Sequence, residues 1–544
     1  MTIKGAGNLL GEIMEFKRFG AMLDCSRNAV MKVCEIKRMI DYLVKMGYNA
    51  LELYTEDTYE VKGEPYFGYL RGRYTCDELK EIDAYALEKG VELIPCIQTL
   101  AHFNNLVKLP AYVDIVDTND ILLIDEPKTY ELIDKIFYSL SISFTSRTVH
   151  IGMDEAHMVG LGKYLDKHGF CNRYEILLRH LNKVLEIAKK YGFTVHMWSD
   201  MFFRLANKGE YYVNSATEMQ TSEFSIPNGV ELVYWDYYHH DKETYDGMIL
   251  KHKEISDSVW FAGGAWSWCG FAPLNKFSLS TMYPAMQSVL EHKIENVLIT
   301  MWGDNGKECS FYSLLPSLYA IRKFADGITD MQAIKQGFNN LFGFDFDDFM
   351  LLDLPNEIPV EKEPLTIENP SKCFLYADCF ANSFDCCYKN QKETDYLKIS
   401  KLLKKTSKKA GEFAYLFTEL ASLCDVLQIK ATLSKKIRMA YETKNNQELK
   451  RLVHSFDLLI IKLKKFHEEF YRLWHKENKT FGWEIHDARL GGLIQRIKTC
   501  KRRLNDYLNG EMQCIEELHE IILSFGDDWL FNNQYSRIIS VNDI

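Results

Sequence analysis

The sequence predicts an α/β protein: a (β/α)8 TIM barrel followed by an all-α C-terminal domain. Eight short runs rich in apolar and β-branched residues recur over about the first 345 residues, and most of the intervals between them have the apolar period of a helix. All twelve prolines lie at or before Pro370, and the residues after it contain only six glycines. Eight strands that alternate with helices are typical of a closed parallel barrel.

The eight predicted strands have similar lengths and follow one another at intervals that leave room for a helix. In chain order they are Phe19–Leu23, Tyr48–Tyr54, Val91–Ile97, Thr148–Met153, Thr194–Trp198, Val230–Trp235, Trp260–Trp266 and Asn296–Trp302. Continuous apolar runs of this length are expected for strands of a parallel sheet.

The predicted helices of the first half lie between these strands, at positions that include Met31–Met46, Cys76–Lys89, Thr129–Leu140 and Tyr174–Tyr191. In the second half, amphipathic runs cover Leu397–Leu427, Ala431–Met439 and Gln447–Trp474. Four prolines crowd between the two halves, which marks a linker. We therefore predict a barrel domain at 1–350, a Pro-rich linker at 351–370 and a helical domain at 371–544.

Composition excludes several classes of protein. The 544 residues are 47% hydrophobic and carry a net charge of -11, without a face-sized block of Lys and Arg, so we expect no nucleic-acid partner. No apolar run is long enough to span a bilayer, and the N-terminus has no secretory pattern. The fourteen cysteines form no Cys-x-x-Cys pair, which fits a reducing compartment. We expect a cytoplasmic protein that is not bound to a membrane.

The residues that follow the predicted strands should line one pocket, because the carboxyl ends of barrel strands meet at one face. They are mostly polar or aromatic, and five of the nine tryptophans lie among them. Flat rings stack on the C–H faces of a sugar, while charged groups bind its hydroxyls. The candidate residues for such a pocket are Asp24, Arg27, His102, His150, Asp154, Glu155, Trp198, Trp235, Tyr237, Trp266, Trp268, Trp302 and Asp304.

The fourth strand ends in two adjacent carboxylates, within RTVHIGMDEAH from Arg147 to His157. Neighbouring strand residues point to opposite faces, so Asp154 and Glu155 can reach one ligand only where the strand ends and the backbone turns. Crowded carboxyl groups have pKa values that are pushed apart, which leaves one protonated and the other charged. This division between acid and anion is typical of a glycosidase.

These motifs resemble those of glycoside hydrolase family 20, the β-N-acetylhexosaminidases. HIGMDE at 150–155 is similar to the His-x-Gly-x-Asp-Glu signature of the family, MLDCSR at 22–27 to its first-strand motif, and MWGDN at 301–305 to its last-strand motif. The resemblance covers the barrel from about Phe19 to Phe344. The helical extension, including FGWEIHDARLGGLIQR at 481–496, resembles that of an intracellular subgroup without the N-terminal domain of secreted members.

The resemblance implies an exo-acting enzyme that releases terminal β-linked GlcNAc or GalNAc from small glycans with retention of configuration. Glu155 would protonate the glycosidic oxygen and then activate water as a base. Asp154 would orient the 2-acetamido group of the substrate, whose carbonyl oxygen attacks C1 to form an oxazolinium ion. No cofactor and no metal are expected, because the substrate supplies its own nucleophile.

The resemblance also implies roles for the other candidates. Arg27, with Asp24 beside it, would hold the hydroxyls of the non-reducing end, with Asp304 as a second ligand. The acetamide oxygen would accept a hydrogen bond from Tyr237 or its neighbour Tyr238. His150 would support the carboxylate pair from behind, whereas His102 fits either a supporting role or the core. The tryptophans expected to wall the pocket are Trp198, Trp235, Trp266, Trp268 and Trp302.

Two departures from the pattern concern the shape of the pocket: Met153 stands where a small residue is common, and the last-strand acid is Asp304 where many members have Glu. Two other functions stay open at this point. His150, Asp154 and His157 can be read as ligands of a metal-dependent hydrolase, a reading that activity in a chelator would exclude. A non-catalytic carbohydrate-binding protein would keep the pocket without turnover.

The helical half carries Gly491–Gly492, which permits close approach of another backbone. We expect this half to pack against the barrel, and we keep homodimerisation as a hypothesis. A light-scattering mass equal to one 63.4 kDa chain would exclude the dimer.

Overall fold

The computed structural model describes residues 14–213, 226–268, 270–357, 369–388, 393–523 and 534–542. Its centre is a closed barrel in which eight parallel strands pair in chain order and β8 pairs with β1. The strands are β1 (Arg18–Asp24), β2 (Ala50–Tyr54), β3 (Glu92–Cys96), β4 (Thr148–His150), β5 (Thr194–Trp198), β6 (Val230–Trp235), β7 (Val259–Gly264) and β8 (Asn296–Met301). The predicted fold class is confirmed.

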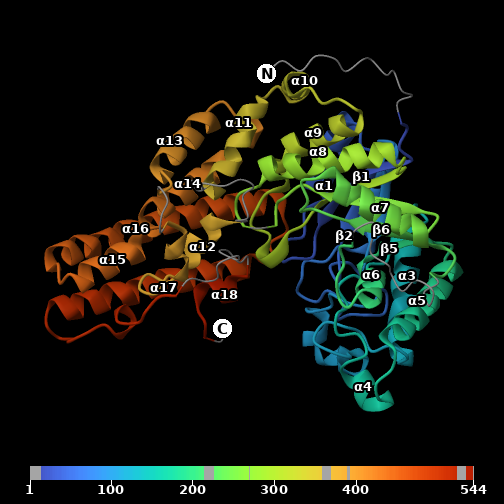
Figure 1. The fold of residues 1–544 in the computed structure, drawn as a ribbon, viewed down its shortest axis with the longest axis horizontal. Coiled ribbons are helices and arrows are strands. Elements are labelled where there is room, and N and C mark those ends of the chain that lie inside the picture. Colours follow the sequence, from blue (N-terminus) through green and yellow to red (C-terminus); the bar gives the residue numbers. More distant parts are fainter. Residues whose placement is uncertain are drawn as a thin grey trace.

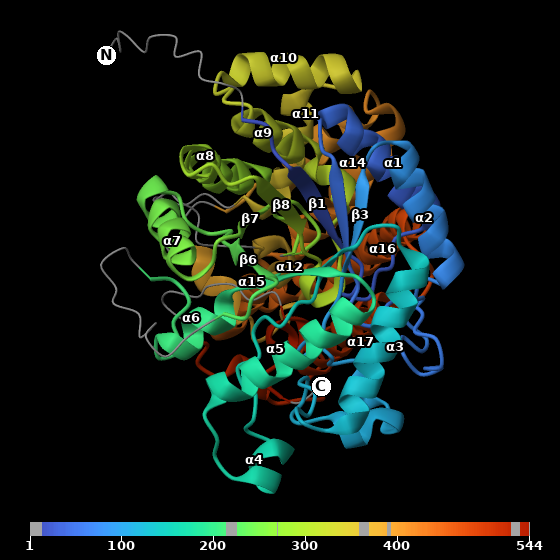
Figure 2. The ribbon, with the colours of Figure 1, turned by 90° about the vertical axis from the view of Figure 1, so that its right-hand side faces the viewer.

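Helices surround the strands on the outside of the barrel, as Figure 2 shows. They are α1 (Val33–Met46), α2 (Cys76–Glu88), α3 (Pro127–Ser143), α5 (Arg173–Lys190), α6 (Asp200–Ala206), α7 (Lys242–Ile255) and α8 (Asn275–Glu291), whereas the short α4 (Lys163–His168) lies farther from the strands, in the connection between β4 and α5 (Figure 1 and Figure 2). The start of α2 shows why the sequence folds locally: Thr75 and Glu78 form a reciprocal capping box. The amphipathic faces of these helices pack on strands whose side chains are almost all buried.

The strand predictions agree with the structure except at strand ends. The fourth strand was expected to run to Met153 but ends at His150, because Gly152 (φ 72°) and Met153 (φ 68°) are left-handed. A Cβ on Gly152 would lie 2.1 Å from Oε1 of Gln98, so only glycine fits there. The chain leaves the sheet three residues early and turns toward the mouth of the barrel.

The first of the remaining helices, α9 (Leu315–Ala325), completes the ring of helices around the barrel. The later ones form a helical region that extends to one side of the barrel (Figure 1). These later helices are α10 (Met331–Phe342), α11 (Phe346–Met350), α12 (Pro370–Tyr376), α13 (Tyr396–Ser407), α14 (Ala414–Lys430), α15 (Leu433–Glu442), α16 (Asn446–Glu477), α17 (Trp483–Leu508) and α18 (Tyr535–Ile539). The predicted run Leu397–Leu427 is two helices, separated near the left-handed Gly411 (φ 51°).

Most of the predicted linker, 358–368, lies outside the described residues, so the domain boundaries stay predictions. Among the helices that the structure describes, none combines the length and the apolar character needed to cross a bilayer.

Candidate active site

A pocket opens at the carboxyl ends of the barrel strands, the position predicted from the sequence. Seven of the eight strands contribute to its lining, through their last residues or the loops that follow them. The lining residues are Arg27, His102, Asp154, Glu155, Trp198, Trp235, Tyr237, Tyr238, Trp268, Trp302 and Asp304. Ten of these eleven belong to the predicted set, and Tyr238 was the stated alternative to Tyr237.

The turn after β4 brings both carboxylates to the same pocket. Glu155 is itself left-handed (φ 51°), so the backbone rotates between the two acids instead of alternating as in a strand. Gln98 fixes this turn: its Oε1 accepts the Met153 N–H at 3.1 Å, and its Nε2 donates to Asp154 Oδ1 at 2.7 Å. The expected change of direction is therefore present, and a side chain from the loop after β3 holds it.

Asp154 forms a buried ion pair with His102. The Nε2 atom of His102 lies 3.0 Å from Asp154 Oδ2 and 3.9 Å from Glu155 Oε2. Burial opposes both charges, but the attraction outweighs it: the carboxylate raises the pKa of His102 to about 9, and the imidazolium with Gln98 lowers the pKa of Asp154 to about 2. Asp154 is thus an anion at neutral pH.

Glu155 has a different environment from its neighbour. Its side chain is 46% exposed and faces the pocket, whereas that of Asp154 is 11% exposed. The backbone N–H of Glu155 donates to Asp200 Oδ2 at 3.1 Å. Burial, with the nearby charges of Asp154 and Glu155, raises the pKa of Asp200 to about 7. The two adjacent carboxyl groups therefore have different environments.

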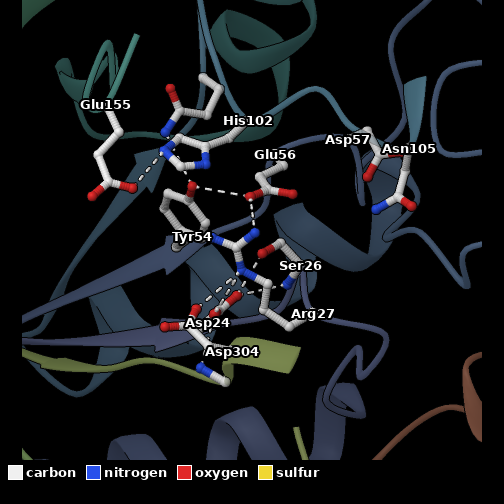
Figure 3. Close-up of polar contacts among 12 residues, drawn as sticks. Asp24, Ser26, Arg27, Tyr54, Glu56, Asp57, His102, Asn105, Glu155 and Asp304 are labelled. Atoms are coloured by element: carbon white, nitrogen blue, oxygen red, sulfur yellow. Dashed lines mark hydrogen bonds and ion pairs between the residues drawn. The ribbon is translucent and has the colours of Figure 1, made fainter. Parts of the chain in front are cut away.

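Arg27 lies at the opposite side of the pocket, among three carboxylates (Figure 3). Its Nη1 is 2.9 Å from Glu56 Oε1, and its Nε is 3.4 Å from Asp304 Oδ1 and 3.6 Å from Asp24 Oδ2. Burial disfavours the charged guanidinium, but these carboxylates raise its pKa well above the ordinary value. Enclosure in the pocket raises the pKa of Asp304 to about 6, against the pull of Arg27.

Aromatic rings form the rest of the wall. Trp302 packs edge-on against Tyr54 and lies 6.0 Å from Trp198 between ring centroids. Trp235 stacks on Tyr237 at 5.4 Å, and Tyr237 meets the edge of Trp268 at 5.5 Å. Rings that pack against one another keep fixed orientations, which gives the pocket a rigid apolar wall.

Three predicted residues do not line the pocket. Both oxygens of Asp24 accept hydrogen bonds inside the protein, Oδ1 from Ser26 and Oδ2 from the N–H of Gly303, so Asp24 lies behind Arg27, and its contact with substrate stays a prediction. His150 is buried beneath Trp198, at 4.3 Å between rings, and its support of the carboxylate pair stays a prediction. Trp266 stacks behind Trp268 at 4.1 Å, so it backs the wall instead of forming it.

Three residues of this site were missed or given no role. Glu56, which binds Arg27, follows β2, and the rule that strand ends line the pocket finds it once it is applied to that strand. Gln98 and Asp200 also stand at strand ends, but their bonds to Asp154 and to the Glu155 backbone depend on loop geometry that a pattern does not contain.

The metal-ligand reading of His150, Asp154 and His157 is not supported, since His150 is buried in the barrel and His157 is exposed. Ligand atoms of Glu52, Cys96 and His150 do lie within 4.8 Å of one another in the barrel core. However, His150 Nδ1 accepts the Gly152 N–H at 3.1 Å, which puts the proton of the neutral ring on Nε2. Neither nitrogen is then free to bind a cation.

The fold and the pocket together define a TIM-barrel enzyme whose site pairs an exposed acid with a buried carboxylate anion. Comparison with models of known protein families identifies the family to which this enzyme belongs. The glycosyl hydrolase family 20 catalytic domain matches residues 16–246, and the glycoside hydrolase 20C C-terminal domain matches residues 347–533. The chain belongs to family 20 and is a glycoside hydrolase.

The individual relatives share less than 30% sequence identity with this chain over the aligned residues. Hexosaminidase D of Bos taurus is 24% identical over 290 residues, which cover 50% of this chain and 75% of the relative. The β-hexosaminidase of Vibrio furnissii is 29% identical over 177 residues, 26% of this chain and only 29% of the relative. The crystal structure of the family 20 exo-β-N-acetylglucosaminidase of Vibrio harveyi with N-acetylglucosamine aligns with a TM-score of 0.45 and 16% identity, over 60% of this chain and 58% of that one.

Proposed function

We propose that the protein is an exo-acting β-N-acetylhexosaminidase that releases a terminal β-linked GlcNAc or GalNAc by a retaining, substrate-assisted mechanism. The observation that carries the proposal is the contrast between the two adjacent acids. Asp154 is a buried anion held by His102 and Gln98, whereas Glu155 is half-exposed to the pocket. One acid is thus placed to stabilise a positive charge and the other to exchange protons with solvent and substrate.

The mechanism assigns each acid a step. Glu155 donates its proton to the glycosidic oxygen as the bond to C1 breaks, and the acetamide oxygen of the substrate attacks C1 from the other face. The acetamide N–H then carries positive charge, which Asp154 stabilises as a hydrogen-bond acceptor. In the second half, Glu155 takes a proton from water as that water opens the oxazolinium ring. Two inversions at C1 leave the configuration retained.

The position of Arg27 supports exo action on one terminal sugar. Arg27 and Asp304 follow β1 and β8, which pair with each other and lie across the barrel from β4, whose loop carries Asp154 and Glu155. A sugar with its anomeric carbon at the acids therefore directs its distal hydroxyls toward a guanidinium and a carboxylate. Such groups recognise free hydroxyls and leave no course for a continuing chain.

The experiment that tests this proposal compares two substrates that differ only at C2. We expect hydrolysis of 4-nitrophenyl β-N-acetylglucosaminide but not of 4-nitrophenyl β-glucoside, because the glucoside lacks the nucleophile. Asp154→Asn should lower kcat on the first substrate by roughly 10²- to 10³-fold, the cost of losing one preorganised contact to developing charge. NMR of the first product should show the β-anomer. Equal cleavage of both glycosides by the wild type would mean that the protein supplies the nucleophile, and the proposal would be wrong.

A further inference from the structure

We propose that the helical region positions the two loops that recognise the distal hydroxyls of the sugar, and so sets the specificity of the pocket without touching the substrate. The loops are the β1 loop (Cys25–Lys32), which carries Arg27, and the β8 loop (Trp302–Ser310), which carries Trp302 and Asp304. The inference rests on the proposed function for the identity of the ligand. Its structural part, the clamping of both loops, stands on the contacts alone.

The β8 loop has an unfavourable backbone conformation. Asn305 (φ 56°), Gly306 (φ 132°) and Lys307 (φ 54°) are three consecutive residues with positive φ, directly after Asp304. Non-glycine residues pay for this conformation, and such a stretch persists only when surrounding contacts determine it. The conformation of this loop therefore requires support from outside the loop.

The helical region provides that support. Arg489 and Lys372 both donate to the carbonyl oxygen of Asn305, at 2.8 Å and 3.1 Å. His486 Nε2 lies 3.1 Å from the carbonyl oxygen of Gly306. The two basic residues come from α17 and α12, so helices far apart in the sequence meet on one strained turn. The carbonyl oxygens of Asn305 and Gly306 thus have their hydrogen-bond partners in the helical region.

A buried charge cluster fixes the same loop to the same helices. Glu308 lies 2.9 Å from Lys372 and 3.2 Å from Arg489, and the side chains of Glu308 and Lys372 are almost completely buried. A Cβ on Gly306 would lie 2.6 Å from Arg489 Nη1, so the guanidinium packs directly on the glycine. Loss of Arg489 would remove one of the two cations that pair with Glu308 and one donor to the Asn305 carbonyl oxygen, which makes Arg489 a sensitive point of this contact.

The turn between α16 and α17 holds the β1 loop in the same way. Met31 and Asn478 form an antiparallel bridge, and the N–H of Lys479 donates to the carbonyl oxygen of Val30 at 2.8 Å. Gly482 (φ 91°) packs on Asn28, whose carbonyl oxygen would lie 2.3 Å from an added Cβ. The chain that carries Arg27 is therefore paired, backbone to backbone, with the helical region.

The two clamped loops also contact each other. The N–H of Gly303 donates to Asp24 Oδ2 at 2.9 Å, and Arg27 lies between Asp24 and Asp304. A shift of either loop therefore moves the guanidinium relative to the Asp304 carboxylate. Because these groups face the sugar end opposite Glu155, we expect the helical region to act on recognition of the distal hydroxyls and not on the chemical step.

The test compares two arginines of α17. Arg489→Met removes the contacts of Arg489 with the Asn305 carbonyl oxygen and with Glu308, and Arg489→Lys is the conservative variant. Arg503→Met is the matched control, because Arg503 pairs with Glu516 and Glu517 inside the helical region. We would measure kcat and KM on the 4-nitrophenyl β-glycosides of GlcNAc and GalNAc, which differ only at the C4 hydroxyl. Hydrogen exchange of peptides covering 302–310 and 150–157 would report the loops directly.

For Arg489→Met we expect a KM about tenfold higher, kcat within threefold, and a GlcNAc-to-GalNAc ratio of kcat/KM changed by at least threefold. Exchange at 302–310 should be faster while exchange at 150–157 is unchanged, and Arg489→Lys should recover part of each effect. Arg503→Met should resemble the wild type. If Arg489→Met does not fold, Gly482→Ala tests the β1 loop by the same kinetic measurements, with hydrogen exchange followed in peptides covering 25–32 in place of 302–310.

Unchanged KM, ratio and loop exchange in a folded Arg489→Met protein would overturn the inference, as would equal changes in Arg503→Met. A wild type inactive on both sugars would instead count against the proposed function. In that case, faster exchange at 302–310 would still establish the clamp, and unchanged exchange would exclude it.

Discussion

The two sides of the pocket are held in place by different parts of the molecule. On the acid side, the strained turn after β4 depends on barrel residues: Gln98 binds Asp154, and Asp200 accepts the Glu155 N–H. On the hydroxyl side, the strained turn after β8 depends on Lys372 and Arg489 from the helical region. Both turns contain residues with a left-handed backbone next to a charged side chain of the pocket. The turn after β4 is supported by the barrel itself, whereas the turn after β8 is supported by the helical region.

Under the proposed mechanism, this difference would separate the chemical step from recognition of the sugar. Loops that a TIM barrel supports internally can keep the acid pair fixed while the rest of the rim changes. Loops that a second domain supports can shift with that domain. Variants on the acid side should therefore change kcat, and variants on the hydroxyl side should change KM and the preference between sugars.

The largest effect that would sharpen this comparison is expected for Glu155→Gln. Protonation of the leaving group matters little for nitrophenolate and greatly for a sugar alkoxide, so the loss should depend on the leaving group. We expect kcat to fall by about 10² on the nitrophenyl glycoside and about 10⁴ on a GlcNAc disaccharide, the range typical of general acid catalysis. Equal losses on both substrates would show that Glu155 does not act as the acid.

A smaller effect, on the other side, is expected for Asp304→Asn. A hydrogen bond to a charged group contributes about 1.5 to 3 kcal/mol, so KM for the nitrophenyl N-acetylglucosaminide should rise by roughly 10- to 100-fold with kcat nearly unchanged. The factor should be the same with a methylumbelliferyl leaving group, because Asp304 faces the other end of the sugar. A loss found in kcat would break the division between the two sides.

The sequence was sufficient for the fold and for most of the pocket lining. Eight β-rich runs predicted eight strands, because buried parallel strands leave a continuous apolar signal. The ends of those strands then predicted the lining, because barrel closure brings them together. The strand at 148–153 was too long because Gly152 and Met153 read as strand continuation, and only the contact with Gln98 shows why the chain turns there.

The sequence was not sufficient for the partners of the lining residues. Asp24 and Trp266 carry the right chemistry at the right strand ends, yet their side chains point to Gly303 and to Trp268. The clamp of Arg489 on the β8 loop joins residues 184 positions apart, and no periodicity encodes such a contact. Hydrogen bonds between loops depend on backbone angles that tertiary packing decides.

The smallest effect is expected for Asp200→Asn, which removes a charge from the acid side and keeps an oxygen to accept the Glu155 N–H. Burial, with Asp154 and Glu155 nearby, raises the pKa of Asp200 from 3.8 to about 7. Between these values the folded protein keeps a proton that the unfolded chain releases, so this group makes the free energy of unfolding fall as pH rises from about 4 to about 7. Asparagine does not ionise, and the variant escapes this loss.

We therefore expect the melting temperature of Asp200→Asn, relative to the wild type, to rise between pH 4 and pH 7 and to level off above pH 8, with kcat changed by less than about tenfold. Thermal unfolding at several pH values measures the difference, and Glu210→Gln serves as the control for loss of an exposed acid from the same connection. A difference in melting temperature between variant and wild type that does not vary with pH would mean that Asp200 is already ionised in the folded protein. The Glu155 backbone would then be held by a carboxylate, and the acid side would carry one more negative charge than the geometry assigns to it.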